Sequence, residues 1–282
     1  MKAPEFGLDW HKILHGEEAF EISMPIPAEG NLIGRTRVAA IVDKGADKGA
    51  LALIERTISE AQTGQTIATV KSTAFMRSYG GFGGPSGPTP ELHQLPNRAP
   101  DLTCDAPTLP QAALIYRLSG DYNPLHADPE VARQGGFRQP ILHGLCSLGI
   151  AGHAILKTVC NYNPDRLESL KLRFSLPVHP GETIRTEIWV DGSSVSFRAR
   201  VVERDVIVLN NGLAMIESGK GNGGLFYRRF RWRRSHRKRT RKRIAKWDTR
   251  HPSWPALPQP QAHVARQGFR AEACLRLASA RL

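Results

Sequence analysis

One short run of this sequence combines a carboxylate, an amide and an imidazole that could together move a proton. Within residues 120–126 these groups belong to Asp121, Asn123 and His126. Pro124 disfavours helical geometry at Asn123, so we expect an irregular loop that can direct Asp121 and His126 toward one point. A carboxylate and an imidazole are well suited to proton transfer near neutral pH. The alternative is a turn capped by Asp121 in which the histidine is incidental.

A second candidate group is the backbone N–H of Gly144, which follows His143 at the start of an apolar stretch. Residues 144–157 are apolar on nearly every side and predict a helix that is buried all round. The first N–H groups of a helix are unpaired and carry partial positive charge, and a glycine lets an oxygen approach them closely. This arrangement suits the oxygen of an enolate. The alternative is that Gly144 only permits a tight entry into the helix.

An internal repeat indicates how the elements around these groups are organised. Residues 20–26 resemble residues 172–178, at an offset of 152 residues, and both runs precede a glycine-containing turn and a strand-like segment. Two copies of one β-rich unit explain this pattern. A long segment with the predicted helix precedes the second copy, but only 19 residues precede the first. We therefore expect the first copy to lack its opening strand and most of its helix.

The remaining periodicity predicts a long antiparallel sheet wrapped round the buried helix. Alternation of apolar and polar residues predicts strands over residues 32–42, 50–58, 66–77, 169–176, 183–191, 193–204 and 205–215. A helix is expected at residues 110–118, followed by an ordered loop over residues 119–142 with a short helix near 129–134. We divide the chain into a first repeat (1–78), a Gly/Pro-rich linker without regular structure (79–100), a second repeat with the site (101–218) and a tail (219–282).

Composition narrows the class of protein further. The chain has 282 residues of which 40% are hydrophobic, enough to bury a core, and no apolar run has the length of a membrane span. The N-terminus has no apolar stretch typical of a signal peptide, so we expect no export. The cysteines form no C-x-x-C pair, which argues against a metal cage or a disulfide framework and for a reducing compartment. They stand at positions 104, 146, 160 and 274.

The net charge of +13 comes from the tail alone. Residues 219–282 hold 18 Lys and Arg against two acidic residues, whereas residues 1–218 hold 21 against 24. We expect the tail to be disordered, since no amphipathic period survives in it. Aromatic side chains interleave with its arginines, a composition that could bind nucleic acid without specificity. These are Phe226, Tyr227, Phe230 and Trp232.

The same residues carry a resemblance to a known family. Residues 116–129, YRLSGDYNPLHADP, resemble the hydratase 2 motif of the MaoC-like family, and residues 140–146, PILHGLC, resemble its oxyanion segment. Shorter similarities occur at residues 14–17, 43–45, 80–84 and 96–98. The resemblance covers about residues 7–218 and implies an α+β double hotdog, in which antiparallel sheet wraps round a central helix in two repeats. The first repeat would be incomplete, because a segment that precedes residue 14 in the family, with its glutamate, has no counterpart here.

The resemblance also implies a reaction, the reversible addition of water to a trans-2-enoyl-CoA to give a (3R)-3-hydroxyacyl-CoA. Asp121 and His126 would activate the water and hand a proton to the α-carbon, Asn123 would orient the water or the aspartate, and the Gly144 N–H would bind the thioester oxygen. No metal or redox cofactor is needed, because the thioester is itself the electron sink. The implied substrate contacts are His15, Gly16, Lys44, Tyr122, Pro124, Leu125 and Phe174.

Several alternatives remain open at this point. Lys44 could pair with a CoA phosphate or be a solvated turn lysine, and His15 and Phe174 could be buried residues without contact to substrate. Another hotdog acyl-thioester enzyme, a thioesterase or a dehydratase, is the rival activity, and an inactive fragment whose tail binds nucleic acid is the rival class. We expect an acyl-CoA substrate, a possible homodimer and a cytoplasmic location. Only the weak C-terminal signal Ala280-Arg281-Leu282 favours the peroxisome.

Overall fold

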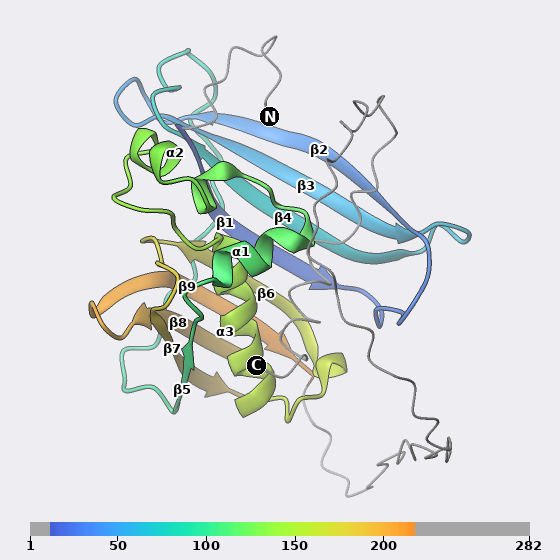
Figure 1. Ribbon diagram of the computed structural model, residues 1–282. Coiled ribbons are helices and arrows are strands. Elements are labelled where there is room, and N and C mark those ends of the chain that lie inside the picture. Colours follow the sequence, from blue (N-terminus) through green and yellow to red (C-terminus); the bar gives the residue numbers. More distant parts are fainter. Residues whose placement is uncertain (1–11, 218–282) are drawn as a thin grey trace, which may run out of the picture. The chain divides into compact units, whose positions relative to one another are not determined.

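The computed structural model describes residues 12–217, in which nine strands form one antiparallel sheet (Figure 1). The strand order is β2-β3-β4-β1-β6-β9-β8-β7-β5. The strands are β1 (Ile13–Ile22), β2 (Leu32–Asp43), β3 (Ala50–Glu60), β4 (Thr66–Met76), β5 (Leu102–Pro107), β6 (Leu167–Phe174), β7 (Thr183–Asp191), β8 (Ser194–Val201) and β9 (Val206–Ile216). The helices are α1 (Ala112–Tyr116), α2 (Pro129–Gln134) and α3 (Gly144–Thr158). The predicted tail, with its expected disorder and nucleic-acid binding, lies outside the described residues.

The pairing register between β1 and β6 agrees with the internal repeat found in the sequence. These two central strands pair antiparallel, with Glu18 opposite Leu172 and Phe20 opposite Leu170. At the repeat offset of 152, Glu18 corresponds to Leu170 and Phe20 corresponds to Leu172. The repeat therefore exchanges the first pair with the second. The two copies are therefore related by an approximate twofold axis between β1 and β6. The strand order has the same symmetry, because β4, β3 and β2 follow β1 as β9, β8 and β7 follow β6.

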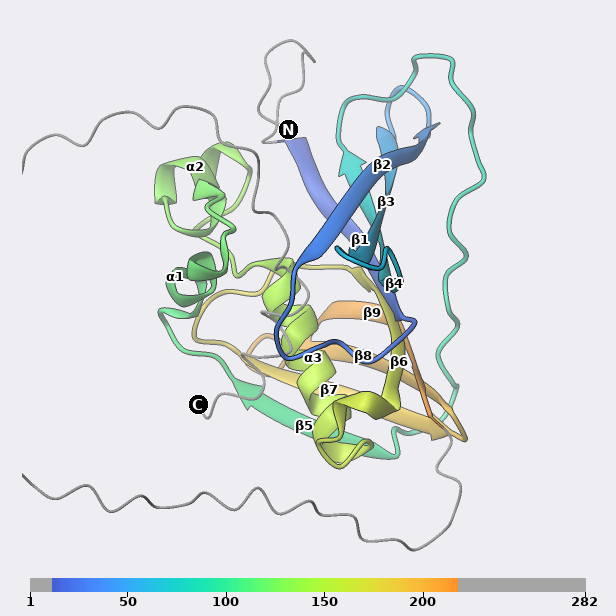
Figure 2. The ribbon, with the colours of Figure 1, turned by 90° about the vertical axis from the view of Figure 1, so that its right-hand side faces the viewer.

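The two halves differ in what covers them, as expected from the uneven repeat. In the second half, β5 extends the sheet beside β7, and α3 lies across the strands (Figure 2). Among the described residues, the first half consists of β1 to β4 and has no counterpart of β5 or α3. The expectation of a double hotdog fold whose first repeat is incomplete is confirmed for this part of the chain.

The main hydrophobic core lies between α3 and the sheet of the second half. The residues Ala151 and Ile155 of α3 are fully buried in one cluster with Leu170, Ile188 and Phe197. Burying such large apolar side chains contributes about 1.5–3 kcal/mol each. Lys157 is the one exposed residue of α3, so the prediction of a helix buried on nearly every side is confirmed. This packing holds the N-terminus of α3 in a fixed position.

The strands β1 and β5 were not predicted from the sequence. In β1 the pairing with β4 shifts between His15 and Glu17, which is a β-bulge. A bulge changes which face successive side chains occupy, so the alternation on which strand prediction depends is interrupted there. The strand β5 is six residues long and ends in Pro107, too short for a clear pattern. The helix α1 begins at Ala112, two residues later than expected.

The Gly/Pro-rich segment after β4 has no helix or strand but is held by one buried side chain. The carboxylate of Asp43 accepts hydrogen bonds from three backbone N–H groups, those of Gly45 at 2.9 Å, Gly81 at 2.7 Å and Gly83 at 2.9 Å. The first of these donors lies in the β2–β3 turn and the other two lie in the segment. Asp43 thus joins this segment to the first half of the sheet.

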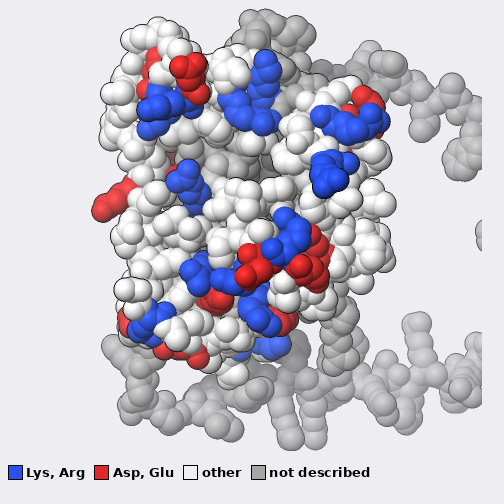
Figure 3. Space-filling model, turned by 90° about the vertical axis from the view of Figure 1, so that its left-hand side faces the viewer, with Lys and Arg blue, Asp and Glu red and all other residues white. Residues whose placement is uncertain are grey.

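The surface of the described residues carries charges of both signs. On the face shown in Figure 3, basic side chains lie beside acidic ones. Among the described residues, ion pairs join neighbouring strands, for example Arg185 with Asp105 at 2.7 Å and Arg37 with Glu55 at 2.9 Å. Within residues 12–217, none of the helices is long and apolar enough to cross a membrane. The same residues contain no group of three or more His, Cys, Asp and Glu side chains that could hold a metal ion.

Candidate active site

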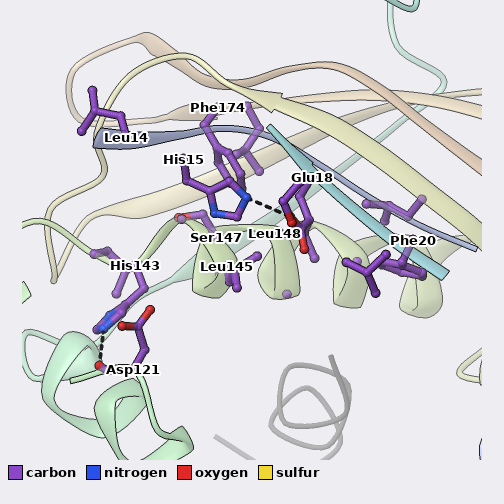
Figure 4. Close-up of a pocket in the computed structure, with 18 of the residues that line it drawn as sticks. Leu14, His15, Glu18, Phe20, Asp121, His143, Leu145, Ser147, Leu148 and Phe174 are labelled. Carbon is purple, nitrogen blue, oxygen red and sulfur yellow. Dashed lines mark hydrogen bonds and ion pairs between the residues drawn. The ribbon is translucent and has the colours of Figure 1, made fainter. Parts of the chain in front are cut away.

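A cavity of about 400 Å³ lies where the two halves of the sheet meet α3 and the loop that follows α1. Apolar side chains of β1, β3, β4 and β6 form much of its wall, and polar groups gather at one end (Figure 4). Five residues that line this end come from the loop and from the start of α3, and they are Asp121, Asn123, His126, His143 and Gly144. Two segments, the loop and the start of α3, thus bring these polar groups to one wall.

The loop that carries Asp121 is built by local hydrogen bonds. Gly120 has φ of 101°, a conformation that glycine adopts readily, and it ends the turn after α1. The backbone N–H of Asn123 donates to Oδ1 of Asp121 at 3.4 Å, and Oδ1 of Asn123 accepts from the Leu125 N–H at 3.2 Å. Pro124 then starts a 3-10 turn that ends at His126. Asn123 therefore shapes the loop with its oxygen, and its amide nitrogen remains to serve the cavity.

The position of the hydrogen on the His126 ring follows from its backbone contact. Nδ1 of His126 lies 2.7 Å from the carbonyl oxygen of Ile141, and a carbonyl can only accept, so Nδ1 carries a hydrogen. In the neutral ring, Nε2 then has a free lone pair. Burial lowers the pKa of His126, against the hydrogen bond to Ile141 and the charge of Asp121, which raise it. A neutral imidazole with one available nitrogen is the form that a general base requires.

His143 is the residue that sequence reasoning passed over, although it stands directly before Gly144. Its ring stacks on the ring of His126 with centroids 3.7 Å apart and an interplanar angle of 27°. Its Nε2 donates to the backbone oxygen of Asp121 at 3.2 Å (Figure 4). The side chain is 1% exposed. The signal available in the sequence was its place in the PILHGLC run, which does not show where the ring points.

Gly144 begins α3, and the aromatic ring of Phe174 lies against it. The first N–H groups of a helix lack intrahelical partners and favour a negatively charged group. A methyl group added to Gly144 would lie 3.1 Å from Cε1 of Phe174, closer than a normal contact. Both residues line the cavity. The glycine therefore keeps open the narrow space between the helix N-terminus and the Phe174 ring.

A second carboxylate–imidazole pair faces the same cavity from β1. Nε2 of His15 lies 2.8 Å from Oε2 of Glu18, and the ring of His15 lies 4.7 Å from the ring of Phe174 (Figure 4). The β-bulge at Gly16 turns His15 to the same face of the strand as Glu18. Glu18 is 8% exposed. Sequence reasoning did not single it out, because ordinary alternation does not place residues three apart on one face.

The other residues inferred to contact substrate have different surroundings. Leu125, like Phe174 and His15, lines the cavity, whereas Gly16, Lys44, Tyr122 and Pro124 are not among the lining residues. Lys44 is exposed in the turn between β2 and β3. Tyr122 is 62% exposed, and the guanidinium carbon of Arg117 lies 5.7 Å from its ring centre. The contacts of all seven residues with substrate stay predictions.

Two protein-family models match this chain. Residues 91–212 match the model of the MaoC like domain, and residues 1–78 match the MFE-2 hydratase 2 N-terminal domain. A protein of Dictyostelium discoideum named probable enoyl-CoA hydratase 2 is 43% identical over 208 residues, which cover 73% of this chain and 70% of that protein. The chain belongs to the MaoC-like hydratase 2 family.

Further MaoC-like relatives support this assignment in sequence and in structure. Enoyl-CoA hydratase 2, peroxisomal, of Arabidopsis thaliana is 40% identical over 218 residues, which cover 74% of this chain and 70% of that protein. The crystal structure of a MaoC-like dehydratase from Phytophthora capsici is 40% identical, with a TM-score of 0.70 over 74% of this chain and 73% of that one. Membership of this enzyme family makes the present chain a hydro-lyase of the MaoC-like type.

Proposed function

We propose that this protein is a (3R)-specific enoyl-CoA hydratase, which adds water reversibly across the double bond of a trans-2-enoyl-CoA. The observation that carries the proposal is the tautomer of His126: with Nδ1–H held by the Ile141 carbonyl, its Nε2 is free at the end of the cavity that Asp121 and Gly144 share. The names of the relatives support an enoyl-CoA substrate, and the apolar walls of the cavity suit an acyl chain.

In the proposed mechanism, a water molecule lies between the carboxylate of Asp121, the amide nitrogen of Asn123 and Nε2 of His126. The water oxygen forms a bond to the β-carbon, while Asp121 and His126 take up one proton from the water. The electrons of the double bond move toward the thioester oxygen, which accepts a hydrogen bond from Gly144 N–H; one such donor contributes about 3 kcal/mol to the barrier reduction. Asp121 and His126 then deliver one proton to the α-carbon, so one water molecule is added in total.

This chemistry requires no cofactor, because the thioester carries the developing negative charge and CoA belongs to the substrate. Leu125, Phe174 and His15 would form the wall beside the reacting atoms. Lys44 would pair with a CoA phosphate only if the nucleotide extends to the β2–β3 turn.

A homodimer remains part of the proposal. The similarity to the peroxisomal enoyl-CoA hydratase 2 of Arabidopsis thaliana favours the peroxisome over the cytoplasm, and fluorescence microscopy of the tagged full chain would decide between them.

The test is the loss of conjugated enoyl-thioester absorbance with crotonyl-CoA and with a longer trans-2-enoyl-CoA. We expect activity in the full chain, a (3R) product by chiral chromatography, and a loss of at least 1000-fold in Asp121→Asn with an unchanged circular dichroism spectrum. Asp47→Asn, which changes an exposed carboxylate in the β2–β3 turn, is the control. Retained turnover in Asp121→Asn contradicts the proposed site, and release of free thiol from saturated acyl-CoA would instead indicate a thioesterase.

A further inference from the structure

His143 connects every segment that carries the proposed chemistry. It is the residue before α3, its ring stacks on His126, and the ring of Tyr116 from α1 lies 4.6 Å away on an inclined plane. Its Nε2 also binds the backbone oxygen of Asp121 at 3.2 Å. A single buried side chain thus contacts the residue that bears the proposed carboxylate and the ring of the proposed base.

The contacts of His143 determine its hydrogen and its charge. Because the Asp121 carbonyl only accepts, Nε2 of His143 carries the hydrogen. Burial, followed by the charge of His126, lowers the pKa of His143 to about 4, so the ring is neutral at physiological pH. The titratable and charged groups that face it are His126, Asp121 and Arg117, and the ring of Tyr116 faces it from α1.

A neutral ring in this place suits the proton cycle of His126. When His126 takes a proton it becomes a cation, and the face of a neutral aromatic ring attracts a cation. A second cation at 3.7 Å would instead repel it. The ring of His143 makes no hydrogen bond that caps α3, so helix capping does not account for it. Its Nδ1 is buried without a hydrogen-bond partner among the described residues. A buried nitrogen without a partner costs stability, so a contribution to the stability of the fold does not explain a histidine at this position.

We propose that His143 is a positioning residue of the hydratase: its Nε2–H fixes the Asp121 backbone, and its ring face orients and supports the His126 imidazole. The inference rests on the proposed function, because it assigns the two contacts a purpose in water addition. It goes beyond that function because proton transfer then depends on the stack of His143 and His126 as well as on the Asp121–His126 pair.

Three substitutions separate the two contacts. His143→Phe keeps an aromatic face and removes the donor, His143→Gln keeps a donor at about the place of Nε2 and removes the ring, and His143→Leu removes both. We expect kcat to fall about tenfold in each of the first two and about 100-fold in His143→Leu, with KM within threefold of the wild type. His153→Phe is the matched control, since His153 lies on the same helix against Tyr162 and does not line the cavity.

Each alternative has its own result. If His143→Leu retains kcat within threefold, or if all three variants lose activity only in proportion to the fraction unfolded in a thermal melt, His143 is not a positioning residue. A long-range ¹⁵N–¹H spectrum of the histidine rings gives a readout without turnover: His143 should be a neutral Nε2–H tautomer at pH 7. If the wild type hydrates no enoyl-CoA, the proposed function fails, and this spectrum still decides the geometry of His143. A protonated His143 or an Nδ1–H tautomer would overturn the inference.

Discussion

The ring of Phe174 lies so close to Gly144 that a methyl group on this glycine would be 3.1 Å from Cε1 of the phenylalanine. Gly144 is the first residue of α3 and Phe174 is the last residue of β6, so the contact joins the helix N-terminus to a central strand. In the proposed mechanism, the thioester oxygen must enter the space that this contact borders. The width of that space is therefore determined by the ring of Phe174 and by the absence of a side chain at Gly144.

Gly144→Ala should impair catalysis without unfolding the protein. Gly144 does not have a positive φ, so its backbone accommodates alanine, and the main structural change is a small displacement of the Phe174 ring. We therefore expect the melting temperature to change by only a few degrees. The added methyl group obstructs the approach of the thioester oxygen, and kcat/KM should fall at least tenfold. Steady-state hydration of crotonyl-CoA measures this effect.

A double variant separates obstruction from displacement. Phe174→Leu gives room to the new methyl group but leaves it in front of the amide, so Gly144→Ala/Phe174→Leu should remain as impaired as the single glycine variant. Recovery of kcat/KM in the double variant would show that the alanine acts only by moving Phe174. Wild-type kinetics in Gly144→Ala would remove the Gly144 N–H from the mechanism.

The pair of His15 and Glu18 should affect substrate binding more than turnover. Glu18 holds His15 against Phe174, and a buried hydrogen bond of this kind contributes about 1 kcal/mol or somewhat more. Glu18→Leu should therefore raise KM about five- to tenfold with kcat within threefold, whereas Glu18→Gln retains an acceptor and should stay close to the wild type. Glu17→Gln is the control, because the neighbouring Glu17 contacts Thr73 and does not line the cavity. An unchanged KM in Glu18→Leu would make the pair structural.

Much of the fold could be predicted because its signals are local and repeated. Alternation and the offset of 152 residues predicted seven strands and an incomplete first copy, and the continuous apolar stretch predicted α3. The strand β1 could not be predicted in the same way, since the bulge at His15 and Glu17 cancels the alternation by which a strand is found. The bulge is stabilised by pairing with β4, a contact between residues about 56 positions apart, as in the Glu17–Thr73 hydrogen bond.

The site residues also differ in whether local sequence or tertiary contacts reveal them. Asp121, Asn123 and His126 could be singled out because their chemistry and spacing lie within one run. The roles of His143 and Glu18 depend on which way a ring or a strand face points, and that direction comes from tertiary contacts with His126 and with the bulge. The choice of Lys44 rather than Asp43 shows the same limit, because the sequence does not reveal that the Asp43 carboxylate receives three backbone N–H groups.

Asp43→Asn should loosen the segment that follows β4. An amide offers one accepting oxygen in place of two, so the hydrogen bonds to Gly81 and Gly83 cannot both persist. We expect a melting temperature lower by several degrees and faster cleavage by chymotrypsin at Tyr79 or Phe82. Asp47→Asn, in the same turn but exposed, should match the wild type. Equal rates of cleavage in all three proteins would mean that Asp43 does not hold the segment.

The neutral state of His143 predicts how stability depends on pH. The pKa of this residue is about 4 in the folded protein against an ordinary value of 6.5, so the unfolded chain binds its proton more readily. The stability contributed by the neutral ring is therefore complete above about pH 6.5 and is lost as the pH falls toward 4. The loss is on the order of 2–3 kcal/mol across this window.

His143→Phe isolates this contribution, because it removes the titrating group and keeps an aromatic ring. Urea unfolding at intervals from pH 7.5 to pH 4.5 should show the free energy of unfolding falling more steeply in the wild type than in the variant. The pKa values of His93, His126 and His153 are also lowered by burial, but these residues remain in both proteins and largely cancel in the difference. Parallel curves for the two proteins would mean that His143 is protonated as easily in the folded state as in the unfolded chain, and the neutral stack on His126 would then be wrong.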